Sequence, residues 1–230
     1  MTDRCSQTST PEGLDFGEVS SELLGPAVDE LARALPVKPN SHGNSDMLDL
    51  QWSFTAVERH GELRVKRPLR EFPAVATVIS AASAALGVSD LGLQSLNVIC
   101  RRYRPGQRIA FHIDRPELFD EPIYGCVLAT TSRSGLEFRH PGGQIFSLSE
   151  SPGTVFRQMG DSRYVWSHGI DDVTAERLSV TWRWVQPEVF ARHQQQGTFF
   201  EADPQDLVEI EVPPRPPPPQ AKKAARWKKR

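Results

Sequence analysis

A succession of short strand-forming segments fills residues 95–185, and it restricts the fold more than any other feature of the chain. Each segment is rich in β-branched and aromatic residues, and glycine-containing or charged loops separate it from the next. Strands that follow one another without helices build antiparallel sheets, so the pattern predicts a β-sandwich or barrel, with the jelly roll foremost. The segments are SLNVICRRY, QRIAFHID, IYGCVLATT, LEFRH, QIFSLS, GTVFRQM, RYVWSHGI and RLSVTWRWV.

Two helices and a hairpin are expected ahead of this region. Apolar residues at helical spacing predict a helix that begins near Pro26 and ends before Pro36. Residues 50–67 predict a pair of strands, and the alanine-rich stretch from Pro73 to Gly87 predicts a buried helix. The fold class is therefore mainly β with flanking helices (α+β), and we expect the helices to pack on one outer face of the β core.

A chain of 230 residues is long enough for one domain with a full core and short extensions. We expect a flexible N-terminus over 1–19 and a domain over 20–200, with its jelly roll at 96–190. The last segment, 201–230, is acidic, then proline-rich (VPPRPPPPQ), then basic, which is typical of an extended linker with a charged tail.

Composition excludes several classes of protein. No apolar run approaches 18 residues, so we expect no membrane span, and the first residues have no apolar core of a secretory signal. The three cysteines, Cys5, Cys100 and Cys126, are scattered and never form a Cys-x-x-Cys pair, which argues against a disulfide framework or a zinc module. An intracellular, reducing compartment fits this pattern best, in the cytoplasm or nucleus.

The net charge of -2 conceals two basic blocks in an acidic chain. Residues 59–115 carry 10 basic and 4 acidic side chains, and the last ten, AKKAARWKKR, carry 6 basic and none acidic. The remaining stretches, 1–58 and 116–220, each have a net charge of -7. Clustered Lys and Arg suit contact with a polyanion such as nucleic acid, while a solvated surface is the alternative.

Two polar residues, His112 and Asp114, interrupt the apolar segment QRIAFHID. Side chains alternate along a strand, so we expect these two on one face and Ile109, Phe111 and Ile113 on the other. An imidazole nitrogen and a carboxylate oxygen at i and i+2 can occupy adjacent positions around one metal ion. His-x-Asp is common by chance, so an ordinary polar strand edge remains the alternative.

A third ligand would have to come from elsewhere in the chain. His168 is one candidate because it lies near the end of a strand and is followed by Gly169, which lets the backbone approach a ligand. Two histidines and one carboxylate on a triangular face form the site of non-haem iron(II) oxygenases. A structural histidine is the alternative, and the other candidates are His42, His60, His140 and His193.

The last strand segment, RLSVTWRWV, has two arginines on one face. Arg177, Ser179, Thr181 and Arg183 alternate with apolar residues. Burying guanidinium groups is costly unless an anion pairs with them. Arginine binds carboxylates through two parallel hydrogen bonds, so the face suits a small dicarboxylate, while an edge strand with solvated arginines is the alternative.

The combined motifs resemble the AlkB family of 2-oxoglutarate- and iron(II)-dependent dioxygenases. RYRPGQRIAFHID is similar to the family's Y-x-P-G … H-x-D pair of strands, GDSRYVWSHGI to its SR … HGI strand, and RLSVTWR to its R-x-N-x-T-[FW]-R. The similarity covers about residues 96–185. Arg101 and Ser179 stand where many family members have Asn.

This resemblance implies a double-stranded β-helix, a jelly-roll or cupin-like core, and a set of roles for the motif residues. Iron(II) would be bound by His112, Asp114 and His168, with 2-oxoglutarate and O2 as co-substrates. The residues implied for 2-oxoglutarate are Tyr103, Arg101, Arg177, Ser179 and Arg183. The implied reaction is the hydroxylation of a C–H bond, which removes a methyl group as formaldehyde when that group is bonded to nitrogen.

The substrate is open to three hypotheses. Oxidative demethylation of an N-alkylated base in RNA or single-stranded DNA is favoured by the basic block and by a substrate lid that the resemblance places at about 40–70. Candidate contacts there are Trp52, which could stack on a base or pack in the core, and Arg64, Lys66, Arg67 and Arg70. The same chemistry on a protein side chain or small molecule is the second hypothesis, and a non-catalytic binding module is the third.

Overall fold

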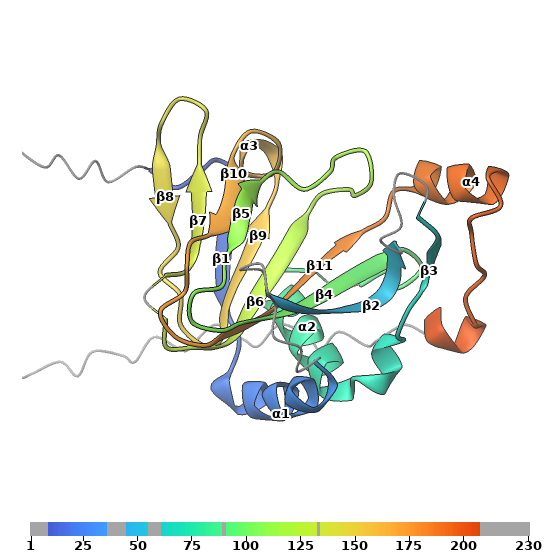
Figure 1. Cartoon of the computed structure of the whole chain (residues 1–230), viewed down its shortest axis with the longest axis horizontal. Coiled ribbons are helices and arrows are strands. Elements are labelled where there is room, and N and C mark those ends of the chain that lie inside the picture. The colour runs from blue at the N-terminus through green and yellow to red at the C-terminus, as the bar shows by residue number, and fades with distance from the viewer. Residues whose placement is uncertain (1–8, 36–44, 55–60, 89–90, 133, 208–230) are drawn as a thin grey trace, which may run out of the picture.

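The structure, a computed structural model, describes residues 9–35, 45–54, 61–88, 91–132 and 134–207. Its core consists of two antiparallel sheets (Figure 1). The larger sheet has the order β1 (Leu14–Glu18), β9 (Thr154–Gln158), β6 (Ile123–Thr130), β11 (Arg177–Trp184), β4 (Leu96–Tyr103), β2 (Asp46–Phe54) and β3 (Leu63–Val65). The smaller sheet has the order β5 (Ile109–His112), β10 (Ser167–Ile170), β7 (Leu136–Arg139) and β8 (Ile145–Ser147).

The strand order identifies the core as a jelly roll, as the sequence predicted. Strands β4, β6, β9 and β11 lie in the larger sheet, and the strands between them in the chain, β5, β7, β8 and β10, lie in the smaller one. The chain therefore crosses repeatedly between two sheets that face each other, which is the double-stranded β-helix arrangement. Side chains on the inner faces of both sheets point into the space between them, so residues far apart in sequence meet there.

Two helices cover the outer face of the larger sheet, as expected. They are α1 (Leu24–Ala34) and α2 (Pro73–Ala85) (Figure 1). Helix α1 buries one apolar stripe, whereas α2 is apolar on nearly all sides; the two helices contact each other, and both contact strand β6. The carboxylate of Glu30 accepts the backbone N–H of Val75, which satisfies one of the free donors at the start of α2.

The remaining helices are short, except for α4 (Pro187–Gln195), which packs against the end of β2 in a separate apolar cluster. They are η1 (Ser21–Leu23), η2 (Leu69–Glu71), α3 (Gly160–Tyr164) and η3 (Pro204–Leu207). Among the described residues, no helix combines the length and the apolar character needed to cross a membrane.

Three local predictions differ from the structure. Residues 14–18, assigned to a flexible terminus, form β1, because their backbone pairs with the edge strand β9. The first part of RYVWSHGI belongs to helix α3, whose Ser162 hydroxyl caps the Met159 N–H, and the strand β10 begins only at Ser167. Strand β5 is shorter than QRIAFHID and ends at His112, so Asp114 lies just beyond it. The predicted hairpin turn between β2 and β3 falls partly on residues 55–60, outside the described residues.

Candidate metal and co-substrate centre

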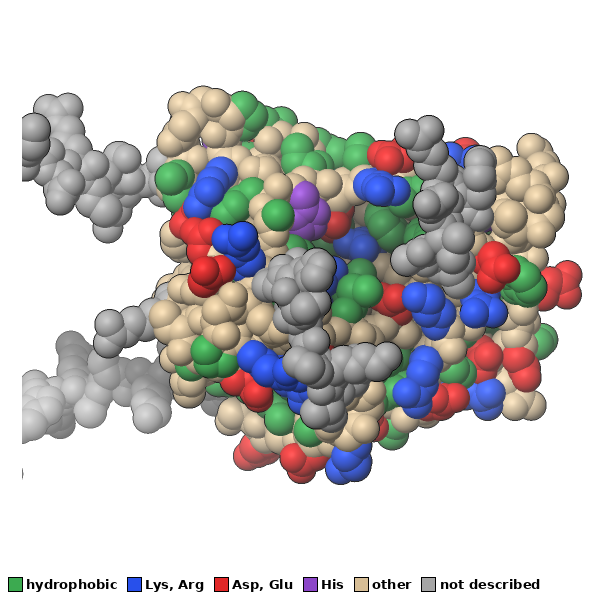
Figure 2. All heavy atoms as spheres, viewed as in Figure 1, with side chains coloured by type: hydrophobic (Ala, Val, Ile, Leu, Met, Phe, Trp, Pro, Cys, Tyr) green, Lys and Arg blue, Asp and Glu red, His purple; other side chains and the backbone are tan. Residues whose placement is uncertain are grey.

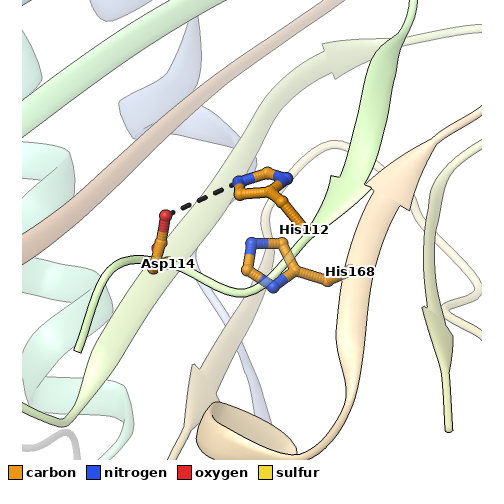
Figure 3. Close-up of side chains that lie close together, drawn as sticks. All are labelled: His112, Asp114 and His168. Atoms are coloured by element: carbon orange, nitrogen blue, oxygen red, sulfur yellow. Dashed lines mark ion pairs between the residues drawn. The ribbon is translucent and has the colours of Figure 1, made fainter. Parts of the chain in front are cut away.

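The three predicted ligands, His112, Asp114 and His168, converge at one end of the space between the sheets (Figure 3). Strands β5 and β10 are neighbours, and their pairing places His112 directly opposite His168. One ligand atom from each of the three residues lies within 4.8 Å of those of the other two. This is the only group of three or more such side chains that could hold a metal ion among the described residues.

Hydrogen bonds fix which atoms of this group are free to bind a metal. Nδ1 of His112 lies 2.8 Å from the carbonyl oxygen of Ala110. A carbonyl can only accept, so Nδ1 carries the proton and Nε2 keeps its lone pair. Oδ2 of Asp114 accepts from Nη1 of Arg183 at 2.7 Å, while Oδ1 lies 3.5 Å from Nε2 of His112. One nitrogen of His112 and one oxygen of Asp114 therefore remain available.

Burial and charge keep His168 and Asp114 in the protonation states that a metal needs. Burial lowers the pKa of His168 to about 4, so its ring is neutral at pH 7. Burial alone would raise the pKa of Asp114, but the charge of Arg183, and the hydrogen bond that His112 donates when its ring is protonated, hold it well below its usual range. The hydrogen bond with Asp114 raises the pKa of His112. The site thus offers an ionised carboxylate between two imidazoles.

A β-bulge between β5 and β10 changes which residues of β5 face the cavity, compared with the prediction from simple alternation. The pairing is regular at His112 and His168 but shifts by one residue before Ile109 meets Ile170. Ile109 consequently lines the same cavity as His112, although alternation predicted it on the opposite face. Ile113, predicted to belong to an apolar face, is 37% exposed.

Gly169, predicted to bring the backbone close to a ligand, lies in a close contact between two strands. A Cβ atom at Gly169 would lie 3.0 Å from the carbonyl oxygen of Ile109 and 3.0 Å from Cα of Phe111. The missing side chain therefore lets β10 approach β5 at the bulge. It is this approach that brings His168 beside His112.

Arg163 is a residue near the site to which the sequence assigned no role. It comes from α3 and is 1% exposed. Its Nη1 donates to the backbone carbonyl of Asp114 at 2.7 Å, and its Nη2 donates to the carbonyl of Phe119 at 3.2 Å. Arg163 therefore fixes the loop that carries Asp114. It lies in the SR … HGI motif, which is the signal that could have identified it.

The arginine-bearing face of β11 lines the same cavity, as predicted. Strand β4 is its neighbour, and Tyr103 pairs with Arg177 and Arg101 with Ser179. These four side chains form a square on the inner face of the larger sheet. Thr181 and Arg183 continue the row toward Asp114. All five residues implied for 2-oxoglutarate thus share one cavity with the three candidate metal ligands. Figure 2 shows a hollow in which a histidine lies beside acidic and basic side chains.

Arg177 has an anionic partner within the chain, which the sequence did not predict. Its Nε and Nη2 donate to the two carboxylate oxygens of Glu150 at 2.8 and 2.7 Å, and both side chains are nearly fully buried. Its Nη1 donates to the hydroxyl of Ser179 at 2.8 Å. Glu150 lies outside every strand, and no sequence motif marks it. Because Glu150 uses Nε and Nη2 of Arg177, a bound anion could contact this guanidinium only through Nη1, which lies beside Ser179.

The residues predicted to contact a nucleic-acid substrate lie away from the cavity. Trp52 is 2% exposed and stacks on Phe199, with ring centroids 5.5 Å apart, so the core-packing alternative is correct for it. Three of the basic residues form ion pairs within the chain, and none of the four lines the cavity. The pairs are Lys66 with Asp49, Arg67 with Glu71 and Arg70 with Asp206, while Arg64 lies over the ring of Phe200.

Curated relatives match a short part of the chain. The chain is 32% identical over 69 residues to the tRNA (carboxymethyluridine(34)-5-O)-methyltransferase alkbh8 of Xenopus tropicalis, and 35% identical over 69 residues to its counterpart in Macaca fascicularis. These stretches are 30% of this chain. Over these residues, the chain is similar to AlkB homologues. It spans about a tenth of the length of the relatives, 11% and 10%, so the similarity is confined to one part of them.

Solved structures and family models provide two further comparisons. A prolyl-4-hydroxylase from Pseudomonas putida is similar in structure, with a TM-score of 0.48 and 15% identity, over 76% of this chain and 92% of that one. No family model matches the chain.

The donor set fits an iron(II) ion. Two imidazoles and one carboxylate form the facial triad that non-haem iron(II) enzymes use, and they leave positions open for other ligands. His168 also has a buried ring nitrogen, Nδ1, without a hydrogen-bond partner, which is unusual for a purely structural histidine. A structural zinc site would instead need four protein ligands, and the cluster offers three.

Proposed function

We propose that the chain is an iron(II)- and 2-oxoglutarate-dependent dioxygenase that hydroxylates a C–H bond. The observation that carries the proposal is the placement of His112, Asp114 and His168 in the same cavity as the polar square of β4 and β11. Iron(II) bound by the three ligands would supply the chemistry by which O2 oxidises 2-oxoglutarate to succinate and CO2 and places its second oxygen atom on the substrate carbon.

The chain's own residues would bind and orient the co-substrate. The Nη1 edge of Arg177, with the hydroxyl of Ser179, faces the cavity and would donate to the distal carboxylate. Arg101 lies beside Ser179, and its Nη1 donates to the hydroxyl of Ser45 at 3.0 Å; among the described residues it forms no ion pair. Arg101 therefore adds a positive charge that has no anionic partner in the metal-free cavity.

Arg183 would hold the metal-binding carboxylate in a single orientation. Its Nη1 donates to Oδ2 of Asp114, while its Nε donates to the side-chain oxygen of Asn97 at 3.2 Å. This leaves Oδ1 as the oxygen that would bind a metal. The guanidinium also lies over the ring of Phe119, 3.9 Å from its centroid, which limits its motion.

For the substrate, we propose an N-alkylated base in RNA or single-stranded DNA. The relatives' printed names describe enzymes acting on tRNA, and the chain has two basic blocks in its sequence. The alternative is a protein side chain or a small molecule with the same chemistry. It is favoured by the ion pairs of Lys66, Arg67 and Arg70, which leave fewer free charges for phosphates. The basic tail lies outside the described residues.

The two free, buried thiols of Cys100 and Cys126 support a reducing, intracellular location for this activity. Burial raises the pKa of Cys126 to about 12, so that thiol is unreactive at neutral pH.

The substrate is tested by incubating the full chain with iron(II), 2-oxoglutarate, O2 and methylated single-stranded RNA or DNA, followed by mass spectrometry. We expect the loss of one methyl mass together with one formaldehyde and one succinate. Succinate production without loss of methyl from any oligonucleotide would contradict the nucleic-acid substrate and favour the alternative. The variant His112→Ala is the control and is expected to be inactive on both measures.

A further inference from the structure

The cavity has one buried polar side chain, Gln158, whose hydrogen bonding is incomplete. Gln158 ends strand β9, between Leu14 of β1 and Ile123 of β6. It is 1% exposed and lines the cavity, and its Oε1 has no hydrogen-bond partner. A buried carbonyl without a donor has lost its hydrogen bonds to water without replacement, which destabilises the folded state. Native proteins rarely keep such a group without a use for it.

His168 presents an atom that would complement this carbonyl. Its Nδ1 is buried without a partner, and one nitrogen of its ring is turned toward Asp114 while the other is turned away (Figure 3). A neutral imidazole has a single N–H, so a metal on Nε2 requires the proton on Nδ1. Histidines that bind metals almost always donate this N–H to a carboxylate, carbonyl or water.

Gln158 is the one candidate acceptor of this kind on the cavity wall. Among the described residues, three buried side-chain oxygens have no hydrogen-bond partner: those of Ser53, Ser83 and Gln158. Only Gln158 lines the cavity that His168 also lines. The other wall residues contributed by β6 and β9 are apolar, namely Ile123 and Phe156. The unpaired acceptor and the unpaired donor therefore belong to the same enclosed space.

We propose that Gln158 is a positioning residue for His168. Its side-chain carbonyl accepts the Nδ1 proton, directly after a turn of the amide or through one water molecule, when a metal occupies Nε2. This contact fixes the tautomer and the orientation of the ring. The inference rests on the metal site of the proposed function and adds a residue to it that no sequence motif marks.

The test is the affinity of the full-length, metal-free chain for cobalt(II), measured by isothermal titration calorimetry. Gln158→Leu removes the acceptor at similar volume, and we expect it to raise the dissociation constant by about 10- to 100-fold. Gln158→Glu keeps an acceptor and is expected to retain the affinity of the wild type. Thr181→Val is the matched control. It removes a hydroxyl group from the wall of the same cavity, and this hydroxyl already donates to the backbone carbonyl of Ile99.

Thermal unfolding of the same metal-free variants separates positioning from a structural role. Gln158→Leu replaces an unpaired polar group by an apolar one, so its melting temperature is expected to equal or exceed that of the wild type. Equal cobalt(II) affinities for the wild type and Gln158→Leu would overturn the inference alone. Failure of the wild type itself to bind cobalt(II) would overturn the metal site, and with it both the inference and the proposed function.

Discussion

At the scale of single residues, two buried ion pairs set the electrostatics of the cavity. Arg183 pairs with Asp114, and Arg177 pairs with Glu150. Each arginine is thereby neutralised where it lies, which is what makes two guanidinium groups tolerable on an inner sheet face. The first pair leaves Oδ1 of Asp114 available to a metal, and the second leaves Nη1 of Arg177 available to an anion. The pairs therefore orient the side chains of the site and limit its net charge.

Replacing Glu150 by Gln should destabilise the protein more than a typical surface change does. The substitution leaves the guanidinium of Arg177 buried without a counter-ion, and breaking such a pair costs about 3–5 kcal/mol. We expect a loss of this order in the free energy of unfolding, measured by urea denaturation. The dianion 2-oxoglutarate should restore part of it, because its carboxylate replaces the lost charge.

The matched control for this change is Glu137→Gln. Glu137 pairs with Arg139 at 2.6 Å in a far more exposed setting, where an ion pair contributes about 0–1 kcal/mol. Similar losses for the two variants would contradict the importance assigned to Glu150.

Acid should weaken the metal-free protein through His168. Its pKa is about 4 in the folded chain against the ordinary histidine value of 6.5, so the unfolded chain takes up this proton first as the pH falls. The stability associated with neutral His168 is complete above pH 6.5 and is lost progressively between pH 6.5 and 4. Urea denaturation at a series of pH values should show this decrease.

The variant His168→Gln provides the comparison, because it has no group that titrates at this position. We expect its free energy of unfolding to fall less across the same window. The raised pKa of His112 acts with the opposite sign and is present in both proteins, so the difference between them reports on His168. Parallel curves for the two proteins would rule out this account.

At the scale of elements, the contact between β5 and β10 assembles the metal site. The bulge beside His112 and the close approach at Gly169 bring the two imidazole rings to a centroid separation of 4.6 Å. The helix α3 then anchors the loop of Asp114 through Arg163. Neighbouring short elements therefore each contribute one part of the ligand geometry.

Gly169→Ala should disturb the site from a position that binds nothing. The new Cβ would lie 3.0 Å from the backbone of β5, so the strands must separate, and overpacking of this kind costs about 1–3 kcal/mol. We expect a lower melting temperature and weaker cobalt(II) binding. Gly25→Ala in α1 is the control, because no atom beyond its chain neighbours and its own helix backbone lies within 4 Å of the added Cβ, and it should leave cobalt(II) binding unchanged.

The sequence predicted most elements of the core because alternation and turn residues are local signals. It also predicted that the three candidate ligands and the arginine face would meet in one cavity, since these residues occur in spaced motifs on strands. It did not predict the bulge that turns Ile109 inward, because one extra residue in a pairing has no compositional mark. Glu150 and Gln158 were missed for a related reason: their meaning depends on which distant atoms the fold brings next to them.

At the scale of the whole molecule, the jelly roll encloses a cavity between two unlike walls. The smaller sheet contributes His112 and His168, while the larger one contributes the arginines and the polar square. The helices α1 and α2 support the larger sheet from outside and contribute nothing to the cavity lining (Figure 1). Lys66, Arg67 and Arg70 lie outside this cavity and form ion pairs within the chain, so any role in substrate binding would be separate from the chemistry.

The most direct test of the central claim is the formation of succinate from 2-oxoglutarate by the full chain, compared between the wild type and His112→Ala. The account predicts iron(II)-dependent succinate formation by the wild type and none above background by the variant, although both should fold, as judged by circular dichroism. Equal succinate formation by the folded variant, or none by the iron-loaded wild type under O2 with substrates of each proposed class, would contradict the account.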